Sequence, residues 1–292
     1  MHGRRFALGE RLGTLPTVSR CAQVARQLAE PTAGTAPSSA RWLCLEWPDP
    51  WPTDVKQVDD PAARRLLERA ADAGFRPLLV RGDRRRVLLT DTSPPGATTT
   101  VVERWDDLVL PSPGAPLPGE PVAGPLLLVC AHEQRDPCCG LDGQALLDAL
   151  AGPDVFACSH LGGHRFAPTA MVLPTGYVYG HLDVALAARI RERAAASEVE
   201  TERCRGRCTW SPGGQVAELA VRAATGLSGP DDLVLIDDRG STVHFNSTAG
   251  GRWAVDVAPV ELDVTRPASC GARPTLVAPL RAAAVRPLRG SR

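Results

Sequence analysis

The chain has no net charge, no long hydrophobic run and only one lysine. Its 292 residues carry 33 basic and 33 acidic side chains, so no overall field favours nucleic acid or an anionic membrane as a partner. Lys56 is the single lysine, which we attribute to a GC-rich genome. No apolar run approaches the roughly 20 residues of a membrane helix. Residues 1–6 are basic but are not followed by the apolar core of a signal peptide. We therefore expect a soluble, cytoplasmic protein.

Cysteine and histidine are unevenly distributed. Four of the nine cysteines and three of the six histidines fall within residues 130–164. An odd number of cysteines cannot all pair within one chain, and clustered cysteines in the cytoplasm act more often as ligands or redox groups than as disulfides. Nitrogen and sulfur donors gathered in this way indicate a metal site or a redox site.

The element pattern predicts an α/β protein in three parts. We expect an N-terminal α/β domain (1–122), a thioredoxin-like domain (123–212), and a C-terminal helix and β-meander with an Arg/Pro-rich tail (213–292). The Pro- and Gly-dense residues 110–124 mark the first boundary. The middle part has the order strand, helix, strand, strand, strand, helix, which is the order of a thioredoxin-like domain. The first part has a roughly similar order, so a diverged duplication is a further hypothesis.

Periodicity and capping residues place the individual elements. We expect helices over 17–30, 61–73, 141–150, 183–195 and 215–225. We expect strands over 41–47, 75–80, 86–89, 98–102, 125–129, 154–158, 169–174, 177–179, 233–236, 241–245 and 253–257. The last 20 residues are rich in Arg and Pro and are expected to be partly disordered.

Four residues of the central stretch are the candidate ligands. Cys130 ends a buried strand, and Cys139 stands directly before a glycine and a helix, where a thiolate gains from the helix dipole and from free backbone N–H groups. His160 and His164 flank Gly162-Gly163, which favours a loop in which the backbone approaches a bulky ligand closely. Two cysteines and two histidines can hold either zinc or a 2Fe-2S cluster, and their spacing leaves that choice open.

The remaining cysteines and histidines have simpler interpretations. Cys44 and Cys158 lie inside strands and are expected to be small buried hydrophobes. His132 is expected to be a plain loop residue. Cys204 and Cys208 are interpreted as a flexible, exposed thiol pair, because no second half of a zinc site follows them. A Rieske site is rejected because only one residue separates Cys158 from His160.

Two longer motifs support a family resemblance. Residues 130–140 read Cys-Ala-His-Glu-Gln-Arg-Asp-Pro-Cys-Cys-Gly, and residues 159–167 read Ser-His-Leu-Gly-Gly-His-Arg-Phe-Ala. With Leu-Pro-Thr-Gly at 173–176 and Tyr-Gly at 179–180, the chain resembles the sucrase/ferredoxin-like family of thioredoxin-fold ferredoxins. Weaker similarity lies at 34–36, 42–43, 205–207 and 215. We see no carboxylate pair that would support the sucrase part of the name.

The resemblance implies a cofactor and its ligands. Characterised members of the family bind a 2Fe-2S cluster through two cysteines and the two histidines of a His-x-Gly-Gly-His motif. Carried over, the thiolate ligands are Cys130 and Cys139, and the imidazole ligands are His160 and His164. Cys138 is an extra thiol next to Cys139, and it leaves open which of the two binds.

The function implied is electron transfer or redox sensing with an unidentified redox partner protein, rather than catalysis. Two alternatives come from other classes. One is a structural Cys2His2 zinc-binding module. The other is a thiol oxidoreductase using Cys138 or Cys139, which the absence of a Cys-x-x-Cys motif at the head of the helix disfavours. Arg135 and Arg165 are candidates for hydrogen-bond donors around the ligands or for a docking surface.

Overall fold

The computed structural model describes residues 20–150 and 152–288 and shows a mixed α/β protein, as predicted. The first half of its main sheet has the order strand, helix and three strands. These are β1 (Arg41–Trp47), α2 (Pro61–Asp72), β2 (Arg76–Arg81), β3 (Val87–Asp91) and β4 (Thr98–Val102). β1 pairs with β2 in parallel and with β3 antiparallel, and β3 pairs antiparallel with β4. The short helix η1 (Val55–Gln57) precedes α2, and β5 (Glu120–Pro121) extends the edge at β4.

The second half repeats this connectivity. Its elements are β6 (Leu126–Cys130), α3 (Pro137–Ala149), β7 (Val155–Cys158), β8 (Ala170–Leu173) and β9 (Tyr177–Tyr179). β6 pairs with β7 in parallel and with β8 antiparallel, and β8 pairs antiparallel with β9. Helix α4 (Val184–Ala195) and strand β10 (Cys204–Arg207) follow, and β10 pairs with β9.

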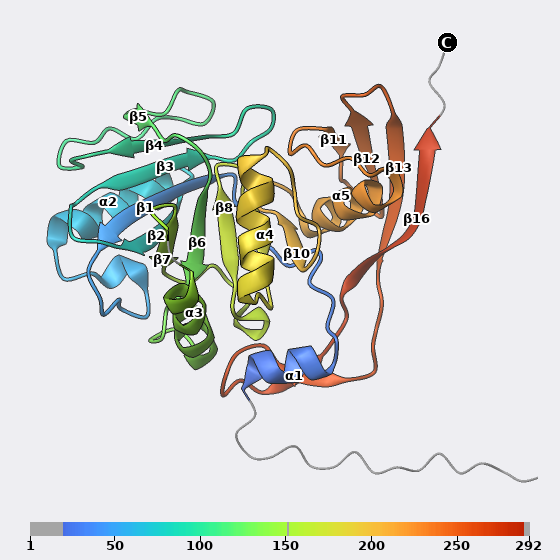
Figure 1. Ribbon diagram of the computed structural model, residues 1–292, viewed down its shortest axis with the longest axis horizontal. Helices are drawn as coiled ribbons and strands as arrows, with labels where there is room; N and C mark the ends of the chain where they lie inside the picture. The colour runs from blue at the N-terminus through green and yellow to red at the C-terminus, as the bar shows by residue number, and fades with distance from the viewer. Residues whose placement is uncertain (1–19, 151, 289–292) are drawn as a thin grey trace, which may run out of the picture.

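The two halves form one continuous sheet. They meet where β2 pairs antiparallel with β7, at Val80 and Cys158. The resulting ten-stranded order is β10-β9-β8-β6-β7-β2-β1-β3-β4-β5 (Figure 1). Strands on both sides of residue 122 therefore share a sheet, and the predicted division into domains stays a prediction.

Alternating side chains give this sheet two distinct faces. Helix α2 covers Leu43 and Leu79 on one face, and α3 and α4 cover Leu127 and Val129 on the same face. The opposite face buries Cys130 of β6 together with Cys158 of β7 and Met171 of β8. Cys130 therefore points away from the layer formed by α2 and α4.

A second, smaller unit follows the main sheet. Helix α5 (Pro212–Thr225) packs on an antiparallel sheet of β11 (Leu233–Asp237), β12 (Thr242–Ser247), β13 (Arg252–Pro259) and β16 (Leu280–Leu288). The predicted three-stranded meander is confirmed. The prediction of a partly disordered tail is wrong for residues 280–288, because β16 pairs with β13 along its length and packs Leu280, Ala282 and Val285 against the α5 core.

The connection between β13 and β16 returns to the main body. It carries the two-stranded hairpin of β14 (Thr265–Pro267) and β15 (Pro274–Leu276). Figure 1 shows α1 (Cys21–Gln27) at the lower edge of the molecule, beside the orange segment that carries this hairpin, and α1 contacts β14. The first described helix and a segment near the end of the chain are thus neighbours.

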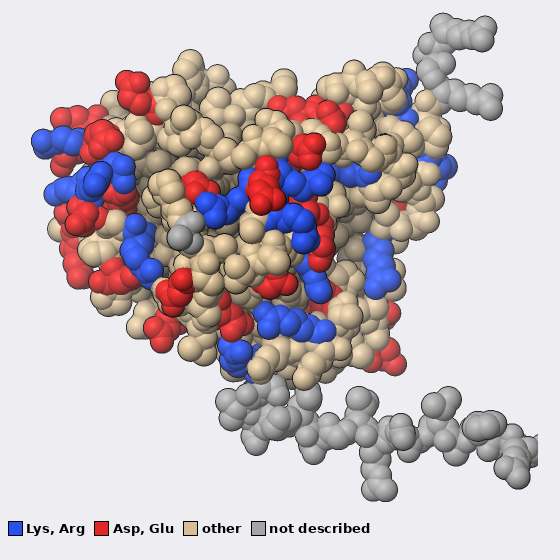
Figure 2. All heavy atoms as spheres, in the orientation of Figure 1, with Lys and Arg blue, Asp and Glu red and all other residues tan. Residues whose placement is uncertain are grey.

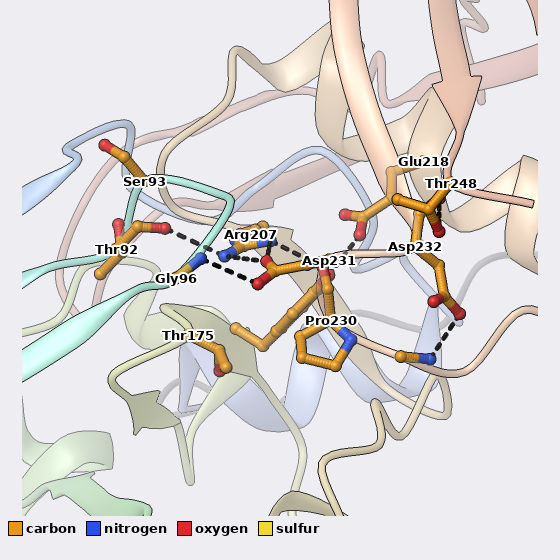
Figure 3. Close-up of polar contacts among 12 residues, drawn as sticks. Thr92, Ser93, Gly96, Thr175, Arg207, Glu218, Pro230, Asp231, Asp232 and Thr248 are labelled. Carbon is orange, nitrogen blue, oxygen red and sulfur yellow. Dashed lines mark hydrogen bonds and ion pairs between the residues drawn. The ribbon is translucent and has the colours of Figure 1, made fainter.

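Arg207 joins the main sheet to the smaller unit. Its Nη1 donates to the Pro230 carbonyl at 2.7 Å, and its Nη2 donates to the Thr92 carbonyl at 3.1 Å (Figure 3). Asp231 pairs with the same guanidinium at 3.2 Å and accepts the backbone N–H of Gly96 at 3.0 Å. Because the Arg207 side chain is fully buried, these partners replace the water it has lost.

The surface shows no dominant charge of one sign on the side that Figure 2 presents. Arginines and carboxylates alternate over that face, in keeping with the balanced composition. Among the described residues, the helices are all too short or too polar to span a bilayer.

Capping side chains set the helix starts. Asp60 accepts the backbone N–H groups of Ala62 at 2.7 Å and Ala63 at 3.2 Å, and Pro61 occupies the first turn of α2. Ser211 caps α5 in the same way by accepting the N–H of Gly214 at 3.0 Å. The predicted α5 begins three residues too late because this cap was not used as a signal.

Removing the α2 cap provides a test of this part of the fold. We expect Asp60→Ala to lower the free energy of unfolding by about 1 kcal/mol, since two backbone donors lose their acceptor. The neighbouring Asp59 is exposed and makes no such bond, so Asp59→Ala is the matched control. Equal midpoints of chemical denaturation for the two variants would contradict the assignment.

Candidate metal centre

The four predicted ligands come together at one end of the second repeat. Cys130 is the last residue of β6, Cys139 lies in the first turn of α3, and His160 lies in the loop after β7. His164 begins the short helix η2 (His164–Phe166). The ligand atoms of Cys130, Cys139 and His160 all lie within 4.8 Å of one another. His164 Nδ1 is 3.8 Å from Cys139 Sγ, and its ring stacks on His160 with centroids 3.9 Å apart.

Helix α3 begins four residues earlier than predicted. Asp136 is its N-cap and accepts the backbone N–H of Cys138 at 2.8 Å, and Pro137 occupies the first turn. The Asp-Pro pair that marks the start of α2 therefore marks this helix too, four residues before the predicted start at 141. As a consequence, Cys138 and Cys139 both lie in the first helical turn, where free N–H groups and the helix dipole favour thiolates.

The adjacent cysteines point to different places. Cys139 packs in the same buried cluster as Cys130. Cys138 Sγ instead lies 3.6 Å from Cys21 Sγ and 3.4 Å from Cys270 Sγ. The geometry therefore brings Cys139, and not Cys138, to Cys130 and the two histidines. Which thiol binds stays a prediction.

The Gly-Gly loop has the left-handed backbone that glycine favours. Gly162 has φ 87° and Gly163 has φ 74°. A Cβ at Gly163 would lie 2.4 Å from Arg205 Nη2. The close approach that needs glycine here is therefore to an arginine side chain of this chain, whereas the sequence analysis expected a bulky ligand.

Arg205 hydrogen-bonds the loop that contains Gly162 and Gly163. Its Nη1 donates to the Gly162 carbonyl at 2.8 Å, its Nε donates to Thr35 Oγ1 at 3.0 Å, and its Nη2 donates to the Thr35 carbonyl. Burial lowers the pKa of Arg205 to about 9, which leaves the guanidinium charged at neutral pH. Its positive charge interacts favourably with the Cys130 and Cys139 sulfurs.

The residues of weaker family similarity surround this arginine. Gly34 N–H donates to the Arg205 carbonyl at 2.9 Å. Gln215 accepts from the Ala36 backbone at 3.1 Å, and a Cβ at Gly206 would lie 2.5 Å from the Gln215 side chain. Positions scattered over the sequence thus form one scaffold behind the histidine loop.

The two thiols of the site titrate in opposite directions. The hydrogen bond to Cys130, with burial, raises the pKa of the Cys139 thiol, so the pair favours one thiolate and one thiol. A hydrogen bond from Cys139, supported by His160, lowers the pKa of the Cys130 thiol. Burial, with repulsion from His160, lowers the pKa of His164 to about 4, so its ring is neutral at physiological pH. Neutral imidazole and thiolate are the forms that bind metals.

Several buried polar atoms of the described residues lack a hydrogen-bond partner, and one of them belongs to this site. His160 Nδ1 is buried and makes no hydrogen bond among the described residues. One ring nitrogen of His160 lies within 4.8 Å of the Cys130 and Cys139 sulfurs, and two thiols with an imidazole are a donor set that suits a bound metal or metal cluster. The donor set therefore passes the test of chemical fit.

Other predicted roles can be compared with the structure. His132 Nε2 hydrogen-bonds the Pro52 carbonyl at 3.0 Å and packs edge-on against Trp51, as a structural loop residue does. Cys44 and Cys158 are buried in the core, and burial raises the pKa of both thiols, that of Cys44 to about 12. Both behave as the small hydrophobes that were expected.

Two expectations fail. Cys204 and Cys208 are buried, not exposed, because β10 is covered by α5 and paired with β9. They belong to core clusters on different faces of the sheet and form no thiol pair. Arg165 donates to Glu30 at 2.8 Å rather than to a predicted ligand. Arg135 is exposed, so its alternative role in a docking surface stays a prediction.

Three further residues near the site are not among the predicted ligands. Asp136 is buried and caps α3, and it also lies 3.8 Å from His164 Nδ1. The others are Cys21, seen only as an apolar helix position, and Cys270. The Asp-Pro pair could have revealed Asp136. Nothing local could have revealed the two cysteines, because their partners lie more than 100 residues away in the sequence.

Comparison with known proteins shows the family of this chain. The profile of the family described as sucrase/ferredoxin-like matches residues 32–206, which is more than half of the chain. A shorter segment of 55 residues is 47% identical to "Altered inheritance of mitochondria protein 32" of Eremothecium gossypii, covering 17% of this chain and 18% of that relative. No solved structure matches. The matched residues include all four predicted ligands and Arg205, and this protein belongs to the sucrase/ferredoxin-like family.

Proposed function

We propose that this protein binds a 2Fe-2S cluster through Cys130, Cys139, His160 and His164 and works as a one-electron carrier or redox sensor. The observation that carries the proposal is the convergence of two buried thiols and two stacked imidazoles, one with an orphaned Nδ1, in a member of a ferredoxin-like family. Such a cluster supplies a reversible one-electron couple. The repeated strand order supports a thioredoxin-like assignment for residues 123–212.

The chain's own charges would set the potential. Two neutral imidazoles in place of two thiolates make the site less negative, which stabilises the reduced form relative to an all-cysteine ferredoxin. The buried Arg205 guanidinium acts in the same direction. Because His164 is neutral without any metal, binding does not first have to remove a proton from it.

Exposure favours electron transfer over thiol chemistry. Cys130 and Cys139 are buried, so a disulfide substrate cannot reach either sulfur, and no Cys-x-x-Cys motif supplies a resolving thiol. The two histidine rings are partly exposed. The imidazoles therefore provide the shortest electron-transfer path between the cluster and the protein surface. The redox partner would dock over the His160–His164 loop.

Metal analysis tests the proposal directly. Protein purified without oxygen is expected to be brown and to contain iron and acid-labile sulfide in equal amounts, about two of each per chain. A colourless protein that holds zinc at these four residues would instead establish the alternative of a structural Cys2His2 module. Inductively coupled plasma mass spectrometry and a sulfide assay distinguish the two results.

The histidines are tested through the potential. His160→Cys and His164→Cys should each keep a cluster but lower its midpoint potential, on the order of 100 mV, because a thiolate replaces a neutral ring. His244→Cys, on β12 of the smaller unit, is the control and should leave the potential unchanged. Unaltered potentials in both ligand variants would remove the histidines from the ligand set.

A pH dependence would follow from the His164 ring nitrogen that points away from Cys139. His164 directs Nδ1 toward Cys139, which leaves Nε2–H on the far side of a partly exposed ring. If oxidation releases this proton, a rise in pH favours the oxidised form, so the potential should fall by up to about 59 mV per pH unit. Protein-film voltammetry measures this slope, and the His→Cys variants should flatten it.

The two neighbouring cysteines can be separated by substitution. We expect Cys139→Ser to lose the cluster, because its sulfur faces Cys130, and Cys138→Ser to keep it, because that sulfur faces elsewhere. Visible absorption and iron content are the measurements. Loss of iron from Cys138→Ser alone would refute the assignment.

A further inference from the structure

Three more cysteines gather next to the first site. Cys21 begins α1, Cys138 lies in the first turn of α3, and Cys270 lies in the turn between β14 and β15. Their sulfurs form a nearly equilateral triangle, with 3.6 Å between Cys21 and Cys138, 3.4 Å between Cys138 and Cys270, and 3.7 Å between Cys270 and Cys21. Ligand atoms of these cysteines and of Asp136 all lie within 4.8 Å of one another.

The triangle has the dimensions of a mononuclear thiolate site. Two sulfurs bound at 2.3 Å to a tetrahedral zinc ion lie about 3.8 Å apart. All three observed edges come close to this value. In a multi-iron cluster, cysteines on different irons are separated by further atoms, so thiols in mutual contact have no room for one.

A disulfide explains the arrangement poorly. All three thiols are free, and three equivalent sulfurs cannot pair among themselves without leaving one over. Packing alone explains it poorly as well, because the small apolar cluster here contains Ala22 and Ala167 as its other members and directs all three sulfurs to one point.

The surroundings suit a negatively charged metal–thiolate group. Asp136 accepts the backbone N–H of Cys138 at 2.8 Å and that of Cys270 at 2.9 Å, which fixes both backbones around its carboxylate. The backbone N–H groups of Ala22 and Cys21 donate to the sulfurs of Cys138 and Cys270. Donors to the sulfur atoms stabilise thiolates around a metal.

Charged side chains complete the arrangement. Glu30 pairs with Arg165 at 2.8 Å and with Arg266 of β14 at 2.7 Å. Arg165 also interacts favourably with the Cys21 sulfur, and Arg20 with the sulfurs of Cys138 and Cys270. Both guanidinium groups also pair with carboxylates, Arg20 with Asp142 at 2.6 Å and Arg165 with Glu30, so they offset only part of the charge that three thiolates and a carboxylate would bring.

We propose that Cys21, Cys138 and Cys270, with the Asp136 carboxylate as fourth donor, form a structural Zn²⁺ site separate from the Cys130–Cys139–His160–His164 site. Three thiolates and one oxygen are a donor set that tetrahedral zinc accepts. The ion fastens two segments that are 249 residues apart, α1 and the β14–β15 turn, to the start of α3.

The zinc site would also support the neighbouring one. Helix α1 packs against η2, which carries His164, and Asp136 Oδ2 lies 3.8 Å from His164 Nδ1. The two sites share no cysteine, so their occupancies can be measured independently.

Zinc and iron contents of the full-length protein test this proposal. Protein purified without oxygen from medium containing both metals is expected to hold about one zinc per chain besides any iron. Cys21→Ser, Cys138→Ser and Cys270→Ser should each lose zinc, while Cys139→Ser should lose iron and keep zinc. Cys44→Ala, which removes a buried thiol outside both sites, is the control and should change neither content.

A milder variant guards against misfolding. Asp136→Asn keeps an N-cap residue of equal quality but removes the charged oxygen donor. We expect it to lower the affinity for Zn²⁺, measured by competition with a chromophoric chelator, at least about tenfold. Far-UV circular dichroism of Cys270→Ser, whose side chain is only half-buried, checks that the fold survives.

Three results would overturn the proposal. One is wild-type protein that takes up no zinc when zinc chloride is added under reducing conditions. Another is zinc retained by all three serine variants of this cluster. The last is zinc lost from Cys130→Ser but kept by Cys270→Ser, which would place the ion at the first site and contradict the iron–sulfur proposal as well. If the wild-type protein contains no iron and Cys270→Ser loses zinc, only the iron–sulfur proposal is contradicted.

Discussion

The cap of α3 by Asp136 is the contact on which the rest of the site depends. This buried carboxylate starts the helix in which Cys138 and Cys139 are neighbours, holds the Cys270 backbone, and lies beside His164. Adjacent residues in a helix project about 100° apart, so one helical turn can supply sulfur to two different clusters. A loop at this position would leave the direction of both thiols undetermined.

Much of the fold could be predicted because its signals are local. The strand over 41–47 and the helix begun by Asp60-Pro61 were read from alternation and capping, and the structure has them at those residues. The missed start of α3 carries the same Asp-Pro signal, so that error was avoidable. Strand β16 was missed because its Arg and Pro content obscured the apolar residues that pack on α5.

The site was predictable where its residues are close in sequence and unpredictable where they are not. Cys130, Cys139, His160 and His164 lie in one stretch with glycines at informative places. By contrast, Arg205 hydrogen-bonds Gly162, which is 43 residues away in the sequence. Cys21 contacts Cys138, which is 117 residues away. Such contacts form through tertiary packing, and sequence periodicity does not predict them.

The shared connectivity of the two halves has a consequence for the number of sites. The main body is equivalent to a dimer built within one chain, joined edge to edge through β2 and β7. In the first half, the residues that correspond to Cys130 and Cys139 are Trp47, at the end of β1, and Ala63, in the first turn of α2. The internal dimer is therefore asymmetric: the second half carries thiols at these two positions, and the first half has the same strand and helix arrangement without them.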